Sequence, residues 1–387
     1  MAASKPMHSH LSFCDAERSW AVATLEALVR AESPTTDKAA VDRCVSEAEQ
    51  RLVAAGARVV RHRQAAAGDH LRAEFGSGRD QVLLLGHLDT VWPVGQLLRM
   101  PLRRESGRLY GPGTYDMKAG VVVAMLAARA VFETGPAPAL RVVLLLTSDE
   151  ETGSATSQAV IEAEARRSRA VLVFEPALPG GGVKTSRKGC GDFSIAVSGV
   201  AAHAGIEPGA GANAIHELAE QILAIERLQD PGRGVSVSVN VVRGGTRANV
   251  VADDARAEVD VRTVSREDAV RLEAALRSLR PHRPGTSLSV TGGFGRPPLE
   301  RTAAVGRLYA LARRVAAGLG MDLAEGGSGG GSDGNFTAAL GVPTLDGLGA
   351  VGDGAHALHE HVDLDSLAPR AALAAGVVAR IFEGELG

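Results

Sequence analysis

The chain has 387 residues, of which 45% are hydrophobic and 22% are charged, an ordinary balance for a globular protein. This length is long for a single core and predicts two domains. The net charge of −3 gives no reason to expect nucleic acid or an anionic membrane as a partner. No apolar run reaches the roughly 18–20 residues that span a bilayer.

Residues 15–57 have helical periodicity, with breaks at Pro34 and Gly56. Further along, continuous apolar segments alternate with amphipathic ones. We predict strands at 57–63, 70–76, 81–89, 140–149 and 170–176, and helices at 119–135 and 157–168. This alternation predicts an α/β fold with a mostly parallel sheet and helices on both of its faces.

The pattern changes after Lys188. Polar and apolar residues alternate at 190–200 and 255–264, as in half-exposed antiparallel strands, and amphipathic helices are expected at 213–229 and 265–279. From Glu300 the buried α/β pattern returns, with helices at 303–320 and from 365. We therefore predict one α/β domain in two parts, residues 1–187 and 298–387, around an inserted α+β domain of residues 188–297.

Three cysteines, Cys14, Cys44 and Cys190, are too few and too scattered for a disulfide framework, so a reducing compartment is expected. The first residues lack an apolar core of signal-peptide length. Together these features predict a cytoplasmic location.

The segment VVLLLTSDEETGS, residues 142–154, poses a physical problem. A buried strand runs directly into Asp149, Glu150 and Glu151. Adjacent carboxylates repel one another and are costly to desolvate unless they are paired. A bound cation would account for them, and the rest of the chain should then supply its other ligands.

Other metal-capable side chains end a strand or open a loop. They are His87 and Asp89 in LLLGHLDT, Asp116 in YGPGTYDMKAG, Glu175 in VFEPA and His356 in GDGAHALHEH. Ligands of open α/β sheets gather beyond the carboxyl ends of the strands, so these groups can converge. Imidazole and carboxylate are the usual ligands of catalytic zinc. Two histidines and three carboxylates suit a pair of metals, and one further carboxylate must stay off the metals as the base. Glu150 and Glu151 could divide these roles.

In combination the motifs resemble those of the zinc metallopeptidase family that contains glutamate carboxypeptidase, aminoacylase, acetylornithine deacetylase and succinyl-diaminopimelate desuccinylase. The motifs are H-x-D after a strand, G-x-x-D-M-K-x-G, D-E-E-x-G-S, F-E-P and a late G-x-H-x-x-x-E, and the likeness covers about residues 19–381. The resemblance implies a zinc exopeptidase-like fold with the inserted domain as a lid or dimerisation domain. It also implies that His87 and Glu175 bind one metal, that Glu151 and His356 bind the other, and that Asp116 bridges them.

The same resemblance implies roles for further residues. Glu150 would be the general base, Asp89 would orient His87, and the Asp116–Met117 peptide bond would be cis. In the inserted domain, His203 would contact the scissile carbonyl oxygen, often in the partner's site. The substrate-binding residues implied are Asn249 and Arg296 for a carboxylate, and Gly329 to Asp333 for a glycine-rich loop.

Simpler interpretations exist for single residues. Asp116 and Asp333 could each cap a helix, and Glu150 with Glu151 could be a solvated helix start. His359 and His361 lie near His356 and could replace it as the ligand. Arg262 competes with Arg296 but more readily pairs within its own domain. The segment EGGSGGGSDGNF could be a flexible linker, although its short length and its Asp equally suit a tight loop.

From these features we expect an enzyme, a zinc-dependent hydrolase with two Zn²⁺ for which Co²⁺ or Mn²⁺ could substitute. The expected reaction is hydrolysis of an amide bond to a residue with a free carboxylate, as in a glutamate carboxypeptidase. An N-acyl-amino-acid deacylase or desuccinylase with the same site is the alternative, and a non-catalytic metal-binding protein is a distant one. The expected partners are a small peptide or N-acyl amino acid and, through the lid, a second copy of the chain.

Overall fold

The computed structural model describes residues 5–135 and 140–386. They form two compact units, which are described separately below. Unit 1 contains the chain up to Thr185, Arg301–Gly327 and the chain from Ser332 onward; unit 2 contains Ser186–Glu300 and Ser328–Gly331. The last of these segments lies in the part of the sequence that we expected to be wholly α/β.

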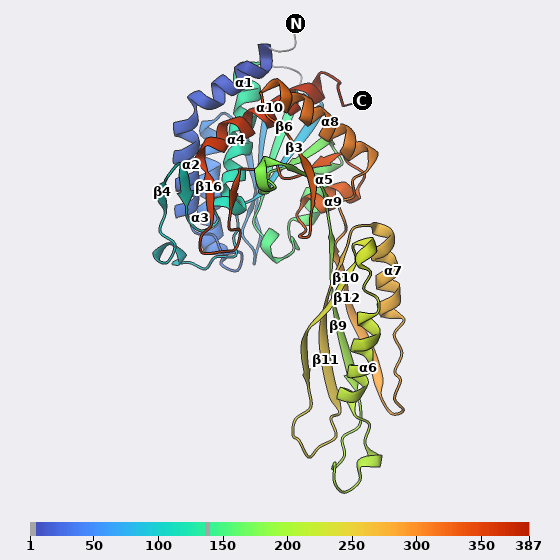
Figure 1. The fold of residues 1–387 in the computed structure, drawn as a ribbon. Helices are drawn as coiled ribbons and strands as arrows, with labels where there is room; N and C mark the ends of the chain where they lie inside the picture. Colours follow the sequence, from blue (N-terminus) through green and yellow to red (C-terminus); the bar gives the residue numbers. More distant parts are fainter. Residues whose placement is uncertain (1–4, 136–139, 387) are drawn as a thin grey trace. The chain divides into compact units, whose positions relative to one another are not determined.

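A six-stranded sheet forms the centre of unit 1 (Figure 1). Its strands β6, β3, β7 and β14 are parallel, while β1 and β2 are antiparallel at one edge. This mostly parallel sheet confirms the predicted fold class. In sheet order the strands are β1 (Arg58–His62), β2 (His70–Gly76), β6 (Leu140–Thr147), β3 (Asp80–His87), β7 (Ser168–Val173) and β14 (Thr344–Leu345).

Helices cover both faces of this sheet, which explains why its inner strands are continuously apolar. Val82 and Leu84 of β3 pack into the larger core, while Leu83 and Leu85 pack into the smaller one. The larger core is covered by α2 (Arg18–Arg30), α3 (Lys38–Ala54), α4 (Ala119–Thr134), α8 (Ala303–Gly318) and α10 (Leu367–Phe382). The smaller core is covered by α5 (Gln158–Ala165) and α9 (Gly334–Ala339).

The first helix, α1 (Lys5–Ala16), was not predicted, because we expected helix only from residue 15. It packs against α10 and α4, and Cys14 is completely buried in that contact region. Tertiary packing thus stabilises a segment whose own apolar periodicity is weak. Among the described residues, no helix combines the length and the apolar character needed to cross a membrane.

A second, small antiparallel sheet in unit 1 was also not predicted. Its strands in order are β15 (Gly352–Asp353), β16 (His361–Asp363), β5 (Arg108–Tyr110) and β4 (Arg103–Glu105). Strands of two or three residues are too short to show a period in the sequence. The sheet joins two distant parts of the chain, because β16 pairs with β5.

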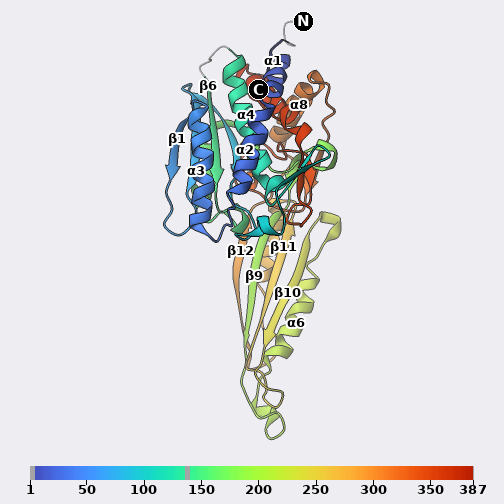
Figure 2. The ribbon, with the colours of Figure 1, turned by 90° about the vertical axis from the view of Figure 1, so that its left-hand side faces the viewer.

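Unit 2 is a four-stranded antiparallel sheet (Figure 2), with α6 (Ala214–Glu226) and α7 (Arg266–Arg277) packed on one face (Figure 1). The strand order is β10 (Ser236–Gly244), β11 (Asp254–Thr263), β9 (Gly189–Ser198) and β12 (Ser287–Arg296). The two ends of the long segment of unit 2, Ser186–Glu300, lie side by side. Arg187 and Leu299 exchange backbone hydrogen bonds of 2.9 and 3.0 Å there. Strands β8 (Val183–Arg187) and β13 (Glu325–Ser328) pair with each other, and the chain passes between the units within both of them.

The glycine-rich segment is a fastened loop. The guanidinium of Arg187 donates to the carbonyl oxygens of Gly330 and Gly331, at 3.1 and 3.0 Å, and the N–H of Lys188 donates to Ser328. Three hydrogen bonds to backbone oxygens of one short segment explain why Ser328–Gly331 belongs to unit 2 and why the linker interpretation is wrong.

The turn that follows β6 is held by a buried polar cluster. The ring nitrogens of His70 lie 2.9 Å from Ser148 Oγ and 3.1 Å from Thr156 Oγ1. Asp149 accepts from both the N–H and the hydroxyl of Thr156, each at 2.7 Å. His70 is completely buried, and this burial lowers its pKa below the ordinary value of 6.5, only partly offset by the charge of Asp149.

Close packing of α4 makes the first prediction. A Cβ at Gly120 would lie 1.9 Å from the carbonyl oxygen of Phe174, a contact that the backbone cannot relieve cheaply. We expect Gly120→Ala to lower the free energy of unfolding by about 3 kcal/mol, as overpacking does. Gly306→Ala is the matched control, because a Cβ there meets only the flexible end of Arg301 at 3.4 Å. It should gain up to about 1 kcal/mol from helix propensity. Urea unfolding measures both, and an equal effect of the two changes would contradict the prediction.

The buried His70 makes the second prediction. Below about pH 6.5, His70 is protonated in the unfolded chain but stays neutral in the folded one, because burial lowers its pKa. The free energy of unfolding therefore decreases as the pH falls below that value. Wild type should therefore lose more stability than His70→Gln between about pH 7.5 and about pH 5.5. Urea unfolding in the presence of chelator measures this difference. Parallel losses in the two proteins would show that His70 does not resist protonation.

Candidate metal centre

Three of the metal-capable segments lie at the carboxyl ends of neighbouring parallel strands. In the sheet register, His87 pairs with Thr147 at the end of β6, and Leu85 pairs with Val173 at the end of β7. Two residues further along each strand, His87 and Glu175 reach the same level. The parallel sheet therefore brings together the groups that follow β3, β6 and β7.

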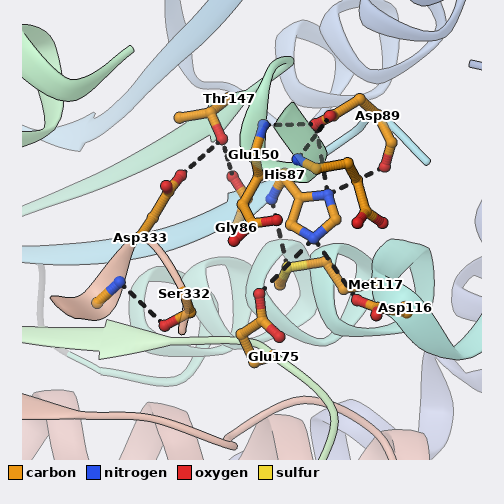
Figure 3. A network of polar contacts seen from close by, with 12 residues as sticks. Gly86, His87, Asp89, Asp116, Met117, Thr147, Glu150, Glu175, Ser332 and Asp333 are labelled. Atoms are coloured by element: carbon orange, nitrogen blue, oxygen red, sulfur yellow. Dashed lines mark hydrogen bonds and ion pairs between the residues drawn. The ribbon is translucent and has the colours of Figure 1, made fainter. Parts of the chain in front are cut away.

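Asp116 lies between the two predicted ligand histidines. Its Oδ1 is 3.6 Å from His87 Nε2, and its Oδ2 is 3.3 Å from His356 Nε2. Glu175 Oε1 also lies 3.6 Å from His87 Nε2, and Glu151 Oε2 lies 3.4 Å from His356 Nε2 (Figure 3 shows the His87 side). Each imidazole thus neighbours one carboxylate that the other imidazole does not contact, and both imidazoles neighbour Asp116.

Asp89 fixes the orientation of His87 and of the acidic turn at once. Its backbone oxygen is 3.0 Å from His87 Nδ1, and its completely buried carboxylate lies 3.4 Å from the same nitrogen. That carboxylate also accepts from the N–H groups of Glu150 and Glu151, at 3.3 and 3.1 Å, and from the hydroxyl of Thr35 at 2.6 Å. Sequence analysis does not identify Thr35, which lies more than fifty residues from its partner.

The donor set fits a divalent cation. At bond lengths of about 2.0–2.1 Å, neighbouring ligand atoms of tetrahedral zinc lie about 3.3 Å apart, close to the separations found here. His87, Asp116 and Glu151 each offer an atom within 4.8 Å of the others. Among the described residues, Glu151 Oε1 is buried and has no hydrogen-bond partner. A buried carboxylate oxygen without a donor is costly, and a cation would satisfy it.

The electrostatics of the site point the same way. Hydrogen bonds with Asp116 and Glu151 raise the pKa of His356 to about 10. Burial would lower the pKa of His87, but contacts with Asp116 and Asp89 outweigh it and raise that pKa well above 6.5. Burial would likewise raise the pKa of Asp116, and the two imidazoles instead hold it below its usual range. Protons on the imidazoles balance the carboxylates when no cation does, and a cation that binds here displaces them.

His356 is the histidine of its segment that reaches the carboxylates. It lies in the hairpin between β15 and β16, with a positive φ of 60° and a side chain that is 50% exposed. His361 instead packs against Tyr110 with its ring tilted, and the ring centroids are 5.0 Å apart. The Asp116–Met117 peptide bond is cis, which confirms that expectation.

Glu150 differs from Glu151 in its surroundings. The negative charge of Glu150 contributes to the raised pKa of His87, so its carboxylate lies near that imidazole. Glu150 and Glu151 are the first two residues of a short 3₁₀ turn, Glu150–Thr152, and their N–H groups donate to the Asp89 carboxylate. Figure 3 shows Glu150 and Asp89. The two consecutive acids thus neighbour different imidazoles, Glu150 that of His87 and Glu151 that of His356.

The substrate-binding candidates of unit 2 do not gather in one place within that unit. Arg296 pairs with Cys190 on the sheet, whereas Asn249 lies in the loop beyond Gly244 and Asp254, at the level of Ser198. The strand from Cys190 to Ser198 spans about 26 Å. One carboxylate therefore cannot touch both residues of the same chain, and the predicted binding by both residues requires two chains.

His203 lies beside Asn249 in unit 2. The N–H of Ala204 donates to the Asn249 carbonyl at 3.0 Å. The side chains of His203 and Asn249 are both exposed. By contrast Arg296 is only 8% exposed, and its Cδ would lie 2.9 Å from a Cβ at Gly331. Arg262 pairs with Asp260, as expected. Gly329 is exposed, with open space around it.

Asp333 contacts both ends of the acidic turn. Its side chain makes no cap hydrogen bond to α9, so the capping interpretation is wrong. The carboxylate is 3% exposed and accepts from Thr147 Oγ1 at 2.9 Å (Figure 3) and from the hydroxyl of Ser154. Asp333 thus connects both ends of the acidic turn, and its part in substrate binding stays a prediction.

Comparison with known proteins agrees with this geometry. Residues 83–380 match the family described as Peptidase family M20/M25/M40. Carboxypeptidase G2 of Pseudomonas sp. (strain RS-16) is 29% identical over 378 residues, 94% of this chain and 90% of that protein. Succinyl-diaminopimelate desuccinylase of Xanthomonas euvesicatoria pv. vesicatoria is 31% identical over 360 residues, 88% of this chain and 93% of that protein.

The fold is shared with solved structures. The crystal structure of aminopeptidase PepT from Bacillus cereus ATCC 10987 has a TM-score of 0.77 at 21% identity, and the match covers 94% of this chain and 99% of that one. The family match spans most of the chain, and the convergent imidazoles and carboxylates lie within it. The chain belongs to Peptidase family M20/M25/M40 and is a metal-dependent enzyme of the peptidase and amidohydrolase type.

Proposed function

We propose that this enzyme hydrolyses the amide bond to a residue with a free carboxylate, as a carboxypeptidase of the glutamate carboxypeptidase kind. The observation that carries the proposal is Asp116 between two imidazoles, next to the buried and unpartnered Glu151 Oε1. The likeness to carboxypeptidase G2 over 94% of the chain supports the reaction class.

We further propose that the site holds two Zn²⁺, for which Co²⁺ or Mn²⁺ can substitute. His87 and Glu175 would hold one ion, Glu151 and His356 the other, and Asp116 both. When bound, two zinc ions polarise a carbonyl group and acidify water. Each imidazole has its own carboxylate neighbour, which supports this division of the ligands.

Glu150 is the proposed proton carrier. It takes a proton from the attacking water and returns it to the nitrogen of the leaving amine, so no net proton is consumed in the cleavage step. Its backbone N–H is tied to Asp89, which also orients His87. Because Asp89 contacts both residues, it holds Glu150 and the His87 imidazole at a set position relative to each other.

The roles of the other candidates stay predictions. His203 would donate to the developing oxyanion, and Asn249 or Arg296 would bind the substrate carboxylate. Gly329 belongs to the loop that Arg187 fastens, which makes it a candidate for backbone contact with a substrate.

A deacylase or desuccinylase is the second candidate function. The relative that supports it is the succinyl-diaminopimelate desuccinylase, which is 31% identical over 88% of this chain. The same ligands and the same base would serve both reactions, so the difference lies in which acyl group is accepted.

The third prediction tests these two functions together. The zinc-loaded enzyme is assayed for amino acid release from a panel of dipeptides, N-acyl glutamates, other N-acyl amino acids and N-succinyl diamino acids, with and without chelator. We expect about two zinc ions per chain and chelator-sensitive release of glutamate. Faster release from N-succinyl diamino acids would favour the desuccinylase.

Glu150→Gln is the control for this experiment. Because the variant keeps the ligands but cannot carry the proton, it should bind the same amount of zinc and lose at least about 100-fold in kcat. Near-wild-type turnover in Glu150→Gln would refute Glu150 as the base. A wild-type chain that binds no divalent cation would refute the metal centre.

We also propose that the enzyme is a homodimer in which unit 2 of one chain completes the site of the other. Strand β10 is an edge of its sheet, and its Val241 and Val242 are 43% and 54% exposed. Arg296 and Asn249 of one chain also lie too far apart for one carboxylate. If both bind it, they come from different chains.

The fourth prediction uses mixed dimers. Glu150→Gln and Asn249→Ala are each expected to be nearly inactive. Subunits mixed after dissociation should recover about a quarter of wild-type activity, since half of the dimers are mixed and each then holds one complete site. Light scattering checks the mass. A monomeric mass, or a dimer without recovery, would contradict sharing between chains.

A further inference from the structure

Glu360 carries a buried carboxylate that contacts the turn bearing Asp116. The residue is 1% exposed, and both of its oxygens are fully engaged. Oε1 accepts from the N–H groups of Tyr115 and Asp116, at 2.9 and 3.0 Å. Oε2 accepts from the N–H of Gly113 at 2.8 Å and from the indole of Trp92 at 2.7 Å. Four donors thus converge on one acid.

These donors belong to the turn that presents Asp116. The N–H groups of Gly113, Tyr115 and Asp116 donate to Glu360, whereas that of Thr114 donates to the Gly111 carbonyl within the turn. The three N–H groups are thus satisfied by one carboxylate and not by a helix or strand ladder. Gly113 permits the turn, because it has a positive φ of 69° and a Cβ there would lie 2.6 Å from Thr90. The backbone of Asp116 is therefore held by Glu360 rather than by regular structure.

The same acid lies at the base of the hairpin that carries His356. Glu360 follows His356 by four residues and directly precedes β16. Gly354, with a positive φ of 82°, packs against the backbone of Glu360, where a Cβ would lie 2.9 Å away. Trp92 comes from the loop after Asp89. One carboxylate thus connects the segments that bear the shared aspartate, one imidazole and the H-x-D motif.

Tyr115 extends this connection to the segment of Glu175. Its N–H donates to Glu360, and its hydroxyl donates to the carbonyl oxygen of Ala177 at 2.8 Å. The hydroxyl oxygen is buried with the ring, which is 9% exposed. Displacement of Glu360 would therefore shift both the Asp116 turn and, through Tyr115, the segment that carries Glu175.

We propose that Glu360 is the positioning residue of the metal centre. It sets the place of Asp116 relative to His356, and through this the affinity and coordination geometry of the bound cations. The proposal rests on the metal-dependent function proposed above. A purely structural acid would stabilise the fold without affecting cation binding, so the two roles are separable by measurement.

Glu164 provides a matched control. It is also buried in unit 1, at 4% exposure, and its two oxygens accept from Arg72 and Gln81 at 2.9 Å each. Gln81 is the second residue of β3 and His87 is its last, so this acid lies about 20 Å from the ligands along the strand. Replacement of either Glu by Gln keeps the shape but turns one accepting oxygen into an amide donor that faces other donors.

The fifth prediction compares Glu360→Gln with Glu164→Gln. Zn²⁺ affinity is measured by competition with a chromophoric chelator, Co²⁺ geometry by visible absorption, and stability by thermal unfolding in chelator. Both variants should unfold at a lower temperature than wild type. Only Glu360→Gln should bind Zn²⁺ about 10–100-fold more weakly and change the cobalt spectrum.

Unchanged cation affinity and an unchanged cobalt spectrum in Glu360→Gln would overturn the proposal, and so would an equal loss of affinity in Glu164→Gln. If Glu360→Gln does not fold, Glu360→Asp takes its place, with Glu164→Asp as its control. It keeps the charge but draws it back from the turn, so wild-type affinity in Glu360→Asp would also overturn the proposal. A wild-type chain that binds neither cation would instead refute the metal centre.

Discussion

Electrostatic repulsion among carboxylates at the ends of β3, β6 and β7 is the constraint around which unit 1 is built. The parallel sheet forces acids into one small volume, where they cannot separate and are poorly solvated. Two responses are visible. Asp89 is held by N–H donors and a hydroxyl, which stabilise its charge. Asp116 is flanked by two imidazoles whose pKa values are raised, so that positive charge is present whether it is carried by protons or by a cation.

The site is assembled from two sheets with different properties. The large sheet supplies His87, Glu151 and Glu175 through strand ends whose places are set by continuous backbone pairing. The small sheet supplies the Asp116 turn and the His356 hairpin, and its strands are only two or three residues long. Strands this short form few backbone hydrogen bonds and restrain the attached loops only weakly. The buried carboxylate of Glu360 adds four hydrogen bonds that restrain the Asp116 turn. Rigidity in this half of the site comes from side chains.

What the sequence could predict follows the same division. The long apolar strands and the helices between them have clear periods, so the large sheet and the residues after its strands were identifiable. The small sheet was not, because such short strands have no period and their pairing joins residues about 250 positions apart. For the same reason the donors to Glu360 were invisible, although the acid itself lies in the G-x-H-x-x-x-E motif. The separation of Arg296 from Asn249 depends on the length and register of β9, which motif spacing does not encode.

The paired ends of unit 2 have a consequence for how this chain could have arisen and diverged. Arg187 and Leu299 exchange two backbone hydrogen bonds, so a segment of more than a hundred residues leaves and returns through a gap no wider than one antiparallel bridge. To the sheet of unit 1, that whole segment is equivalent to a single hairpin loop. The entropy of closing a loop grows only slowly with its length. The insertion could therefore be lengthened, trimmed or exchanged during evolution while every strand end that carries a carboxylate stayed in register, so unit 2 is free to change faster than the part of unit 1 that holds the candidate metal centre.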